Sequence, residues 1–222
     1  YRSDPSKEAS SQLSPYFHSG QISTHEVFDK ISELESWSPE SINPKMVGRR
    51  EGWWGSTENF ESFMDELITW RELGYHTCVR RANYNQYSSL PEWAIKTLHE
   101  HSSDEREHIY SLDELTYSQT HDEIWNAAQN QLRTQGVIQN YLRMLWGKKI
   151  LEWTPNPQIA LSYMITLNDR YSLDGRDPNS YSGVFWILGR YDRAWGPERS
   201  IFGKIRYMTS DSTARKFNLK PY

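Results

Sequence analysis

The stretch SSQLSPYFHSGQIS, residues 10–23, gathers hydroxyl side chains beside the start of a predicted helix. Ser14 and Pro15 fit the N-cap and the first helical position, because proline lacks the amide hydrogen that stays unpaired there. A helix start presents free N–H groups and the positive end of the helix dipole, and Ser10, Ser11 and Ser14 add hydroxyl donors that suit an anionic phosphate. Taken by itself, the local sequence favours serines that simply cap helices.

Aromatic residues make up 14% of the chain, including ten Trp and fourteen Tyr. So many flat rings indicate either an aromatic-rich core or a site that stacks on a planar group. Glu66 and Trp70 lie four residues apart on a predicted helix and therefore share one face. Trp146 and Trp153 lie seven apart, which places them on one face about 10 Å apart along a helix axis. Aromatic residues at helical spacing usually belong to a core, so the spacing alone leaves their role open.

Several common catalytic and metal-binding motifs are absent from the sequence. It has neither the glycine pattern of a dinucleotide-binding βαβ unit nor a phosphate-binding loop, and no nucleophile elbow. His99, His101 and His108 lie close together, but a structural zinc site needs tetrahedral ligands at characteristic spacing. A solvated polar segment is the better interpretation, and no metal site is expected.

The length of 222 residues allows one large domain or two small ones with a sizeable core. Cys78 is the single cysteine, so no internal disulfide is expected, which fits a reducing compartment. The sequence shows no run of roughly 18 apolar residues and no signal peptide, so no membrane span is expected. We expect a monomer, which in a bacterium would be cytoplasmic or associated with the nucleoid.

Charge is distributed unevenly along a chain whose formal net charge is −4. From Tyr141 onward there are 13 Lys and Arg against 7 Asp and Glu, whereas residues 1–140 carry an acidic excess. A basic C-terminal third is compatible with a phosphate-rich partner. A solvated surface with uneven charges explains the same counts equally well.

Helical periodicity and capping signals predict an all-α chain without β-alternation or an internal repeat. The pairs Ser23 with Glu26, Ser111 with Glu114, and Thr120 with Glu123 fit capping boxes. Gly136 is the point where the longest expected helix can break. The expected helices cover residues 14–20, 23–36, 59–74, 91–101, a short segment from 111, 122–153, 157–171 and 177–189.

Five segments occur together in one order: SSQLSPY, ELITWRE, HDEIWNAAQ, NYLRM and LDGRDPN. On these segments the sequence resembles the C-terminal FAD-binding domain of the photolyase/cryptochrome family, from Tyr1 to about Tyr207. WNAAQ, YSLDGRDPNSY and FGKIRYM are most similar to class II cyclobutane-pyrimidine-dimer photolyases. The resemblance implies an all-α helical bundle in which residues 1–222 form one FAD-binding domain, without the α/β antenna domain that normally precedes it.

The resemblance also implies which residues hold FAD in a bent form. A flavin anion needs nearby positive charge, and buried charges need partners. Arg143 would supply a fixed cation, while Asp174 would accept a hydrogen bond from the flavin edge and pair with Arg143. Asn168 would lie near the reactive flavin nitrogen. The implied cofactor-binding residues are Tyr1, Ser10, Ser11, Gln12, Leu13, Ser14, Arg143, Asn168, Asp174 and Asp177.

A substrate cavity is implied in the same way. A flipped pyrimidine dimer needs flat apolar walls and one or two polar groups that recognise it. By resemblance, the residues that hold the lesion are Glu66, Trp70, Met144 and Trp186, while Asn140 and Tyr141 contact DNA. The basic residues expected to face DNA phosphates are Lys204, Arg206, Arg215 and Lys216.

Trp125, Trp146 and Trp153 match the electron-transfer tryptophans of class II-like photolyases. Indole is large and oxidisable, so closely spaced rings can pass an electron from the surface to a flavin. The implied activity is the light-driven splitting of pyrimidine dimers in DNA, with an antenna domain or chain as a further partner. Two alternatives stay open: a cryptochrome-like flavin photosensor, or a flavin-binding relic without photochemistry.

Overall fold

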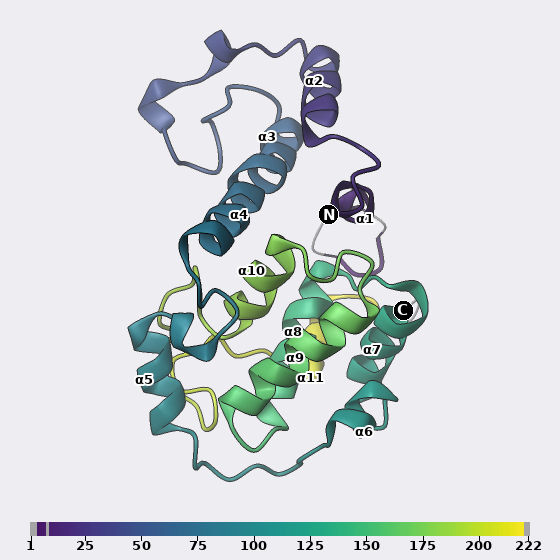
Figure 1. The fold of residues 1–222 in the computed structure, drawn as a ribbon, viewed down its shortest axis with the longest axis vertical. Coiled ribbons are helices and arrows are strands. Elements are labelled where there is room, and N and C mark those ends of the chain that lie inside the picture. Colours follow the sequence, from purple (N-terminus) through teal and green to yellow (C-terminus); the bar gives the residue numbers. More distant parts are fainter. Residues whose placement is uncertain (1–3, 8, 220–222) are drawn as a thin grey trace. The chain divides into compact units, whose positions relative to one another are not determined.

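The structure is a computed structural model that describes residues 4–7 and 9–219. Within these ranges the chain folds into helices joined by loops (Figure 1). The β-type hydrogen bonding in these ranges consists of an isolated bridge between Arg199 and Gly203. The prediction of an all-α chain is therefore confirmed. The contacts divide the chain into two compact units. We call Gln12–Ala82 the smaller unit, and the residues up to Ser11 together with those from Asn83 onward the larger unit.

The smaller unit is built around an aromatic cluster. Trp37 packs against Trp54 and Phe60 with ring centroids 5.7 and 5.6 Å apart, and its indole N–H donates to the Trp54 carbonyl at 2.7 Å. The buried Glu61 carboxylate accepts hydrogen bonds from the backbone amides of Gly52, Gly55 and Ser56, which fixes the loop beside this cluster. The helices of this unit are α1 (Ser14–His18), α2 (Thr24–Leu34), α3 (Glu58–Met64) and α4 (Arg71–Arg80), with short 3₁₀ turns at Pro39–Ser41 and Pro44–Met46.

A π-helical segment, η3 (Asp65–Trp70), connects α3 to α4 in one continuous helical run. Its i→i+5 pattern inserts a residue into the ordinary α-helical repeat, and such insertions frequently occur at functional sites. The Trp70 indole N–H donates to the Asp65 carboxylate, five residues earlier, at 3.0 Å. The expected helix over residues 59–74 thus exists, but it is longer and changes its winding where Glu66 and Trp70 lie.

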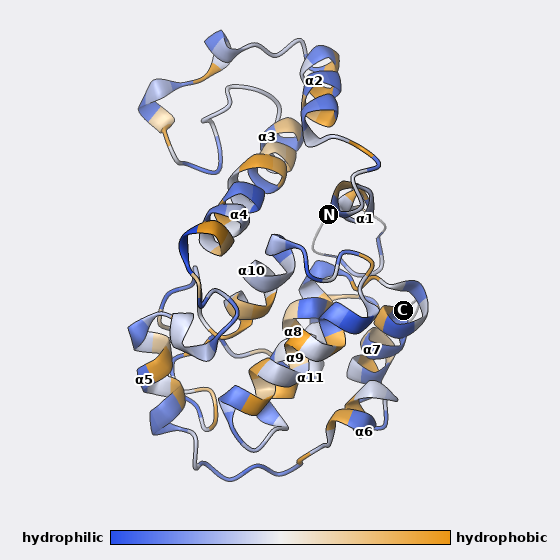
Figure 2. Ribbon diagram, in the orientation of Figure 1, coloured by the Kyte–Doolittle hydropathy of each residue, from blue (hydrophilic) through white to orange (hydrophobic). Residues whose placement is uncertain are grey.

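The larger unit has its core among four helices, α7 to α10, whose mutual contacts enclose Trp125, Leu142, Met164 and Phe185. Figure 2 shows that hydrophobic residues alternate with hydrophilic ones along the helices, as expected for helices that bury one face. The helices of this unit are α5 (Glu92–Glu100), α6 (Leu112–Thr116), α7 (Glu123–Gln135), α8 (Asn140–Glu152), α9 (Pro157–Tyr171), α10 (Pro178–Ile187) and α11 (Ser210–Lys216), with a 3₁₀ turn at Tyr87–Ser89.

Gly136 breaks the long run predicted over residues 122–153. Its φ of 71° is left-handed, and it ends α7 with its amide bonded to the Leu132 carbonyl at 3.0 Å. A Cβ at this position would lie 2.5 Å from Cγ of Leu173, so the turn also needs glycine for space. The conformation lets the Leu173 amide donate to the Gly136 carbonyl at 2.9 Å, which ties the α7–α8 turn to the loop after α9.

The predicted caps were partly wrong. Ser111 and Glu114 form the expected capping box of α6. Asp122 rather than Thr120 caps α7, because the Asp122 carboxylate accepts from the Trp125 amide at 3.0 Å, whereas the Thr120 hydroxyl accepts from the Asp122 amide at 3.2 Å. Ser23 caps α2 through the His25 amide rather than the Glu26 amide.

Two further predictions about local structure were wrong. Helix α1 includes Ser14 itself, and Leu13 precedes it without a side-chain cap. Helix α11 was missed, since it is short and polar and its sequence carries no apolar periodicity. No helix in the described part of the chain has the length and apolar character needed to cross a membrane.

Candidate functional site around α8

Helix α8 carries many of the predicted site residues. It starts at Asn140, after Gln139, whose side-chain oxygen accepts hydrogen bonds from the amides of Tyr141 and Leu142 at 2.7 and 3.3 Å. Asn140 is exposed. The Tyr141 ring packs edge-on against Phe217 with centroids 4.8 Å apart, and the Lys216 ammonium lies 4.6 Å from its centroid. Tyr141, one of the two residues predicted to contact DNA, therefore lies beside a basic residue of α11.

Arg143 is held in place by Asn168 of α9. The guanidinium donates to Oδ1 of Asn168 at 3.0 Å, and Asn168 is buried. The amide of Asn168 donates in turn to the carboxylate of Asp169 at 3.3 Å. The geometry therefore joins Arg143 to Asn168.

Asp174 and Asp177 lie in the tight turn between α9 and α10. The Asp174 carboxylate accepts from the Ser172 hydroxyl at 2.5 Å. Asp177 caps α10 by accepting from the Asn179 amide at 2.9 Å, as its position before Pro178 predicts. A Cβ on Gly175 would lie 2.9 Å from the Asn168 carbonyl oxygen, so this glycine lets the turn approach Asn168 closely. Gly175 was not among the predicted site residues, although a glycine inside a turn is a recognisable signal.

Met144 of α8 and Trp186 of α10 line the same small cavity, of about 20 Å³. Its remaining walls are Lys148, Asp192, Arg206 and Met208. The structure therefore brings together two residues predicted to hold a lesion and one predicted to face phosphate.

Lys148 is a functional candidate that sequence reasoning missed. It is 2% exposed, and its ammonium nitrogen donates to the carbonyl oxygen of Ile187, the last residue of α10. Burial lowers the pKa of Lys148 to about 7, while Asp192 raises it and Arg206 lowers it. Lys148 therefore ties α8 to the end of the helix that carries Trp186. No local pattern marks a lysine as buried, so the sequence held no signal for it.

Arg206 also takes part in a cation–π arrangement. The Trp195 ring has the guanidinium of Arg193 4.1 Å from its centroid and that of Arg206 4.7 Å from it. The indole N–H of Trp195 donates to the Asp192 carboxylate at 3.0 Å. Two exposed arginines are thus held on one aromatic ring beside the Met144–Trp186 cavity.

The three predicted electron-transfer tryptophans lie in the core of the larger unit. Trp125 and Trp153 pack edge-on with centroids 5.6 Å apart. The Trp125 indole N–H donates to the Trp146 carbonyl at 3.0 Å, and the Trp146 indole N–H donates to Oε1 of Gln129 at 2.8 Å. Trp153 is the C-cap of α8 rather than part of its last turn. The structure thus joins all three through direct contacts or hydrogen bonds.

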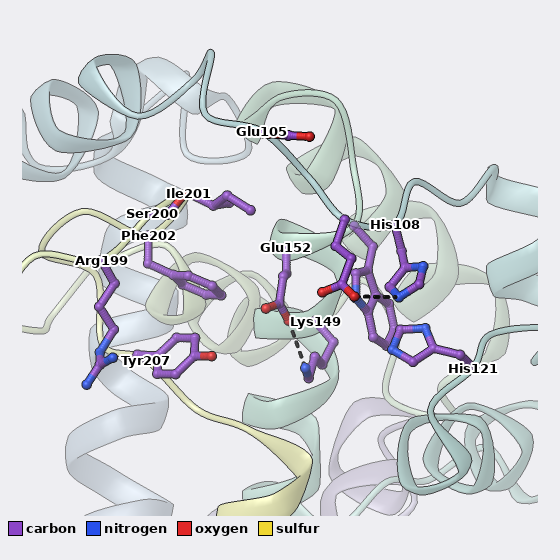
Figure 3. Close-up of a pocket in the computed structure, with 12 residues that line it drawn as sticks. Glu105, His108, His121, Lys149, Glu152, Arg199, Ser200, Ile201, Phe202 and Tyr207 are labelled. Carbon is purple, nitrogen blue, oxygen red and sulfur yellow. Dashed lines mark hydrogen bonds and ion pairs between the residues drawn. The ribbon is translucent and has the colours of Figure 1, made fainter.

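Trp153 also lines a second cavity, of about 380 Å³, which Figure 3 shows in close-up. His121 lies 5.2 Å from Trp153 between ring centroids and 4.0 Å from His108. The ion pair of Lys149 with Glu152, 2.8 Å long, lies between these histidines and the side chains of Phe202 and Tyr207 (Figure 3). Burial lowers the pKa of His121, and the neighbouring His108 lowers it further.

The remaining predicted site residues lie in the smaller unit and in the N-terminal segment before α1. Glu66 is exposed and Trp70 half-buried, both within η3. In the segment before α1, Ser10, Ser11 and Gln12 are exposed, as is Ser14 at the start of the helix, while Leu13 is half-buried. Gln12 has a φ of 55°, which is unusual for a residue other than glycine. Tyr1 lies outside the described residues.

Metal-ligating side chains do not gather in the described residues. No group of three or more His, Cys, Asp or Glu side chains there is placed to hold a metal ion. The histidines near residue 101 take part in other contacts, since Nδ1 of His101 lies 2.7 Å from the Asp104 carboxylate.

These features define a helical protein with a buried tryptophan network, an arginine of α8 hydrogen-bonded to a buried asparagine of α9, and two cavities that residues of α8 line. No family model matches the chain. The chain is 44% identical over 222 residues to a deoxyribodipyrimidine photo-lyase from Methanothermobacter thermautotrophicus, of which it covers 44%. It is 41% identical to the deoxyribodipyrimidine photo-lyase of Potorous tridactylus and 42% to that of Arabidopsis thaliana, covering 38% and 41% of them.

Each of these similarities extends over the whole of the chain. The chain belongs to the photolyase family, which confirms the resemblance seen in the sequence. It spans about two-fifths of the length of the curated relatives that it matches.

Proposed function

We propose that this chain is the FAD-binding part of a deoxyribodipyrimidine photo-lyase and takes part in the light-driven repair of cyclobutane pyrimidine dimers in DNA. The observation that carries the proposal is the identity of 41–44% over the whole chain to proteins that bear this name. Residues 1–222 would act as one cofactor-binding domain of the class II type.

The residues around α8 fit a flavin. Arg143 uses one N–H group for Asn168, and its guanidinium keeps further donors for an anionic ring. Asn168 and the Asp174 turn place polar groups beside it. The exposed serines at residues 10, 11 and 14, with Gln12, Leu13 and Tyr1, would hold the phosphates. Bound FAD would supply light absorption and the electron that splits the dimer.

The chain's own residues would bind the lesion and replace the electron. Met144 and Trp186 would provide apolar walls of the lesion cavity. Glu66 would provide a carboxyl group that hydrogen-bonds to the lesion, and Trp70 would provide a ring that stacks on it. Trp125, Trp146 and Trp153 would carry electrons inward from the surface. Arg206 and the other basic residues of the C-terminal third would contact DNA phosphates.

A flavin photosensor without repair activity is the second candidate, because it would keep the Arg143 site and the tryptophans. The presence of Glu66, Trp70 and Met144 favours repair, since a sensor does not need residues that hold a lesion.

The visible absorption spectrum of the chain loaded with FAD is the first test. We expect flavin absorption bands at ~450 nm. The absorbance of these bands is expected to fall under blue light with a thiol reductant, because the tryptophans deliver electrons to the cofactor. A colourless chain that cannot be loaded with FAD would refute both candidates. Incubating the illuminated chain with an oligonucleotide that holds one thymine dimer then separates them, since a sensor leaves the dimer intact.

A further inference from the structure

The cavity beside Trp153 has the size of a small-molecule site. Its volume of about 380 Å³ lies within the range that such sites occupy. It lies entirely in the larger unit, between the loop before α6, the C-terminal end of α8 and the segment 199–207. None of the roles proposed for flavin or lesion binding uses this cavity.

Flat rings form two sides of this cavity. Trp153, His121 and His108 form a row of rings on one side: His121 meets Trp153 edge-on at 5.2 Å between centroids, and lies 4.0 Å from His108. Phe202 and Tyr207 form the other side, 4.8 Å apart (Figure 3). A planar aromatic ligand that enters the cavity would gain edge or face contacts with these rings.

The charges around the cavity select against anions. Lys149 is engaged by Glu152 at 2.8 Å, and its ammonium also lies 5.3 Å from the Trp153 centroid. Glu105 and Glu107 at the rim are exposed, and the Glu107 side chain is 91% exposed. These two negative charges exceed the one positive charge of Arg199. The lowered pKa of His121 keeps its imidazole neutral at a pH where an ordinary histidine is partly charged. The rim therefore favours a ligand with N–H donors or positive charge.

We propose that this cavity is the docking site for a small aromatic amine that returns an electron to Trp153. The proposal rests on the proposed function, in which the tryptophans pass electrons inward and leave Trp153 one electron short. The bound amine gives one electron to the oxidised indole, which returns to its closed-shell state, and the amine leaves as its radical cation. No bond forms or breaks, and no proton has to move.

The kinetics of Trp153 recovery test this docking. After a light flash, transient absorption would follow the decay of the oxidised tryptophan at increasing concentrations of N,N-dimethyl-p-phenylenediamine. A docked donor gives a rate that saturates, whereas ascorbate, an anion, gives a rate that stays linear with concentration. A linear dependence for both donors would overturn the proposal.

Charge reversal at the rim provides matched variants. Glu105→Lys with Glu107→Lys changes two exposed side chains, so folding is retained, and we expect the half-saturating amine concentration to rise about tenfold. The same variant is expected to speed recovery with ascorbate. Glu100→Lys, an exposed residue of α5 that does not line the cavity, is the control and leaves both donors unchanged. Equal effects of the rim and control variants would contradict a specific site.

Binding in the dark separates this proposal from the proposed function. Quenching of tryptophan fluorescence by the amine, or equilibrium dialysis, measures docking without light. Absence of saturable binding that depends on Glu105 and Glu107 would overturn the docking site even where photochemistry is intact. Saturable dark binding without light-induced oxidation of tryptophan would refute the proposed function and, with it, the electron-returning role of the site.

Discussion

Lys148 shows how one side chain can link two helices of a site. Its ammonium satisfies the Ile187 carbonyl at the end of α10, a position where a helix leaves carbonyl groups without intrahelical partners. The neighbouring carbonyls of Phe185 and Trp186 accept from backbone amides at 3.0 Å, so Ile187 is the one that needs a donor from elsewhere. The donor lies 39 residues away in sequence, which is why no local pattern could predict it.

Replacing Lys148 by methionine is expected to change how stability depends on pH. The folded pKa of about 7 lies below the ordinary lysine value of 10.5, so between these values the unfolded chain binds a proton that the folded chain lacks. Stability of the native chain therefore rises with pH across this window, by about 1 kcal/mol per pH unit near its middle. Urea unfolding at pH 7, 8 and 9 measures the slope. Lys148→Met removes this contribution, whereas Lys96→Met, an exposed control, keeps it.

Trp125 is expected to be essential for electron delivery. Trp125→Phe removes the oxidisable indole and its hydrogen bond to the Trp146 carbonyl, so we expect FAD photoreduction to slow at least about tenfold and stability to fall by about 1 kcal/mol. Trp37→Phe is the matched control, because it loses a similar indole bond to a carbonyl in the smaller unit. Photoreduction followed at ~450 nm compares them. An equal loss of rate in both variants would mean that Trp125 acts only through stability.

At the scale of the elements, the sequence predicted which helices exist better than how they end. The break between α7 and α8 was predictable from Gly136, because a left-handed C-cap strongly favours glycine. Asp122 replaces Thr120 as the cap of α7 because the Thr120 hydroxyl accepts from the Asp122 amide in the preceding turn rather than from an amide of the helix. The change to π-helical winding at η3 was not predictable from periodicity, since the apolar pattern there fits an ordinary helix.

Close packing of α8 on α10 depends on Gly147. A Cβ at this position would lie 2.2 Å from Cδ1 of the fully buried Ile187, so Gly147→Ala is expected to cost about 1–3 kcal/mol and to disturb the Lys148 contact. Gly183→Ala on α10 meets no atom within 4 Å and is expected to be neutral or slightly stabilising. Thermal unfolding measures both changes. Partial rescue of Gly147→Ala by Ile187→Val would identify the clash as the cause.

At the scale of the whole molecule, the order of five short segments predicted the family, and comparison over the full chain confirmed it. Residue roles were predicted less completely, because contacts such as Arg143 with Asn168 depend on how α8 and α9 pack. The distribution of charge is also a property of the whole molecule: its net charge is −4, yet its C-terminal third is basic.

We therefore expect a few basic residues of the C-terminal third to account for the salt dependence of DNA binding. Arg206→Gln should weaken binding about equally for damaged and undamaged DNA and lower the slope of log K against log salt by about 1. Arg170→Gln on α9, whose guanidinium lies 5.3 Å from the Tyr171 centroid, is the exposed control. Fluorescence anisotropy at several salt concentrations measures the slopes. Unchanged slopes for Arg206→Gln would place the phosphate contacts elsewhere.

The hydrogen bonds of the buried tryptophans have a consequence for protons. The indole N–H groups of Trp125 and Trp146 donate to a carbonyl and an amide oxygen, both of which are very weak bases. An indole that loses an electron there has no nearby group able to take its hydrogen, so it keeps the positive charge on its ring. Under the proposed function, electrons would therefore cross the core while protons stay where they are, and the rate of crossing is expected to be the same in light and heavy water.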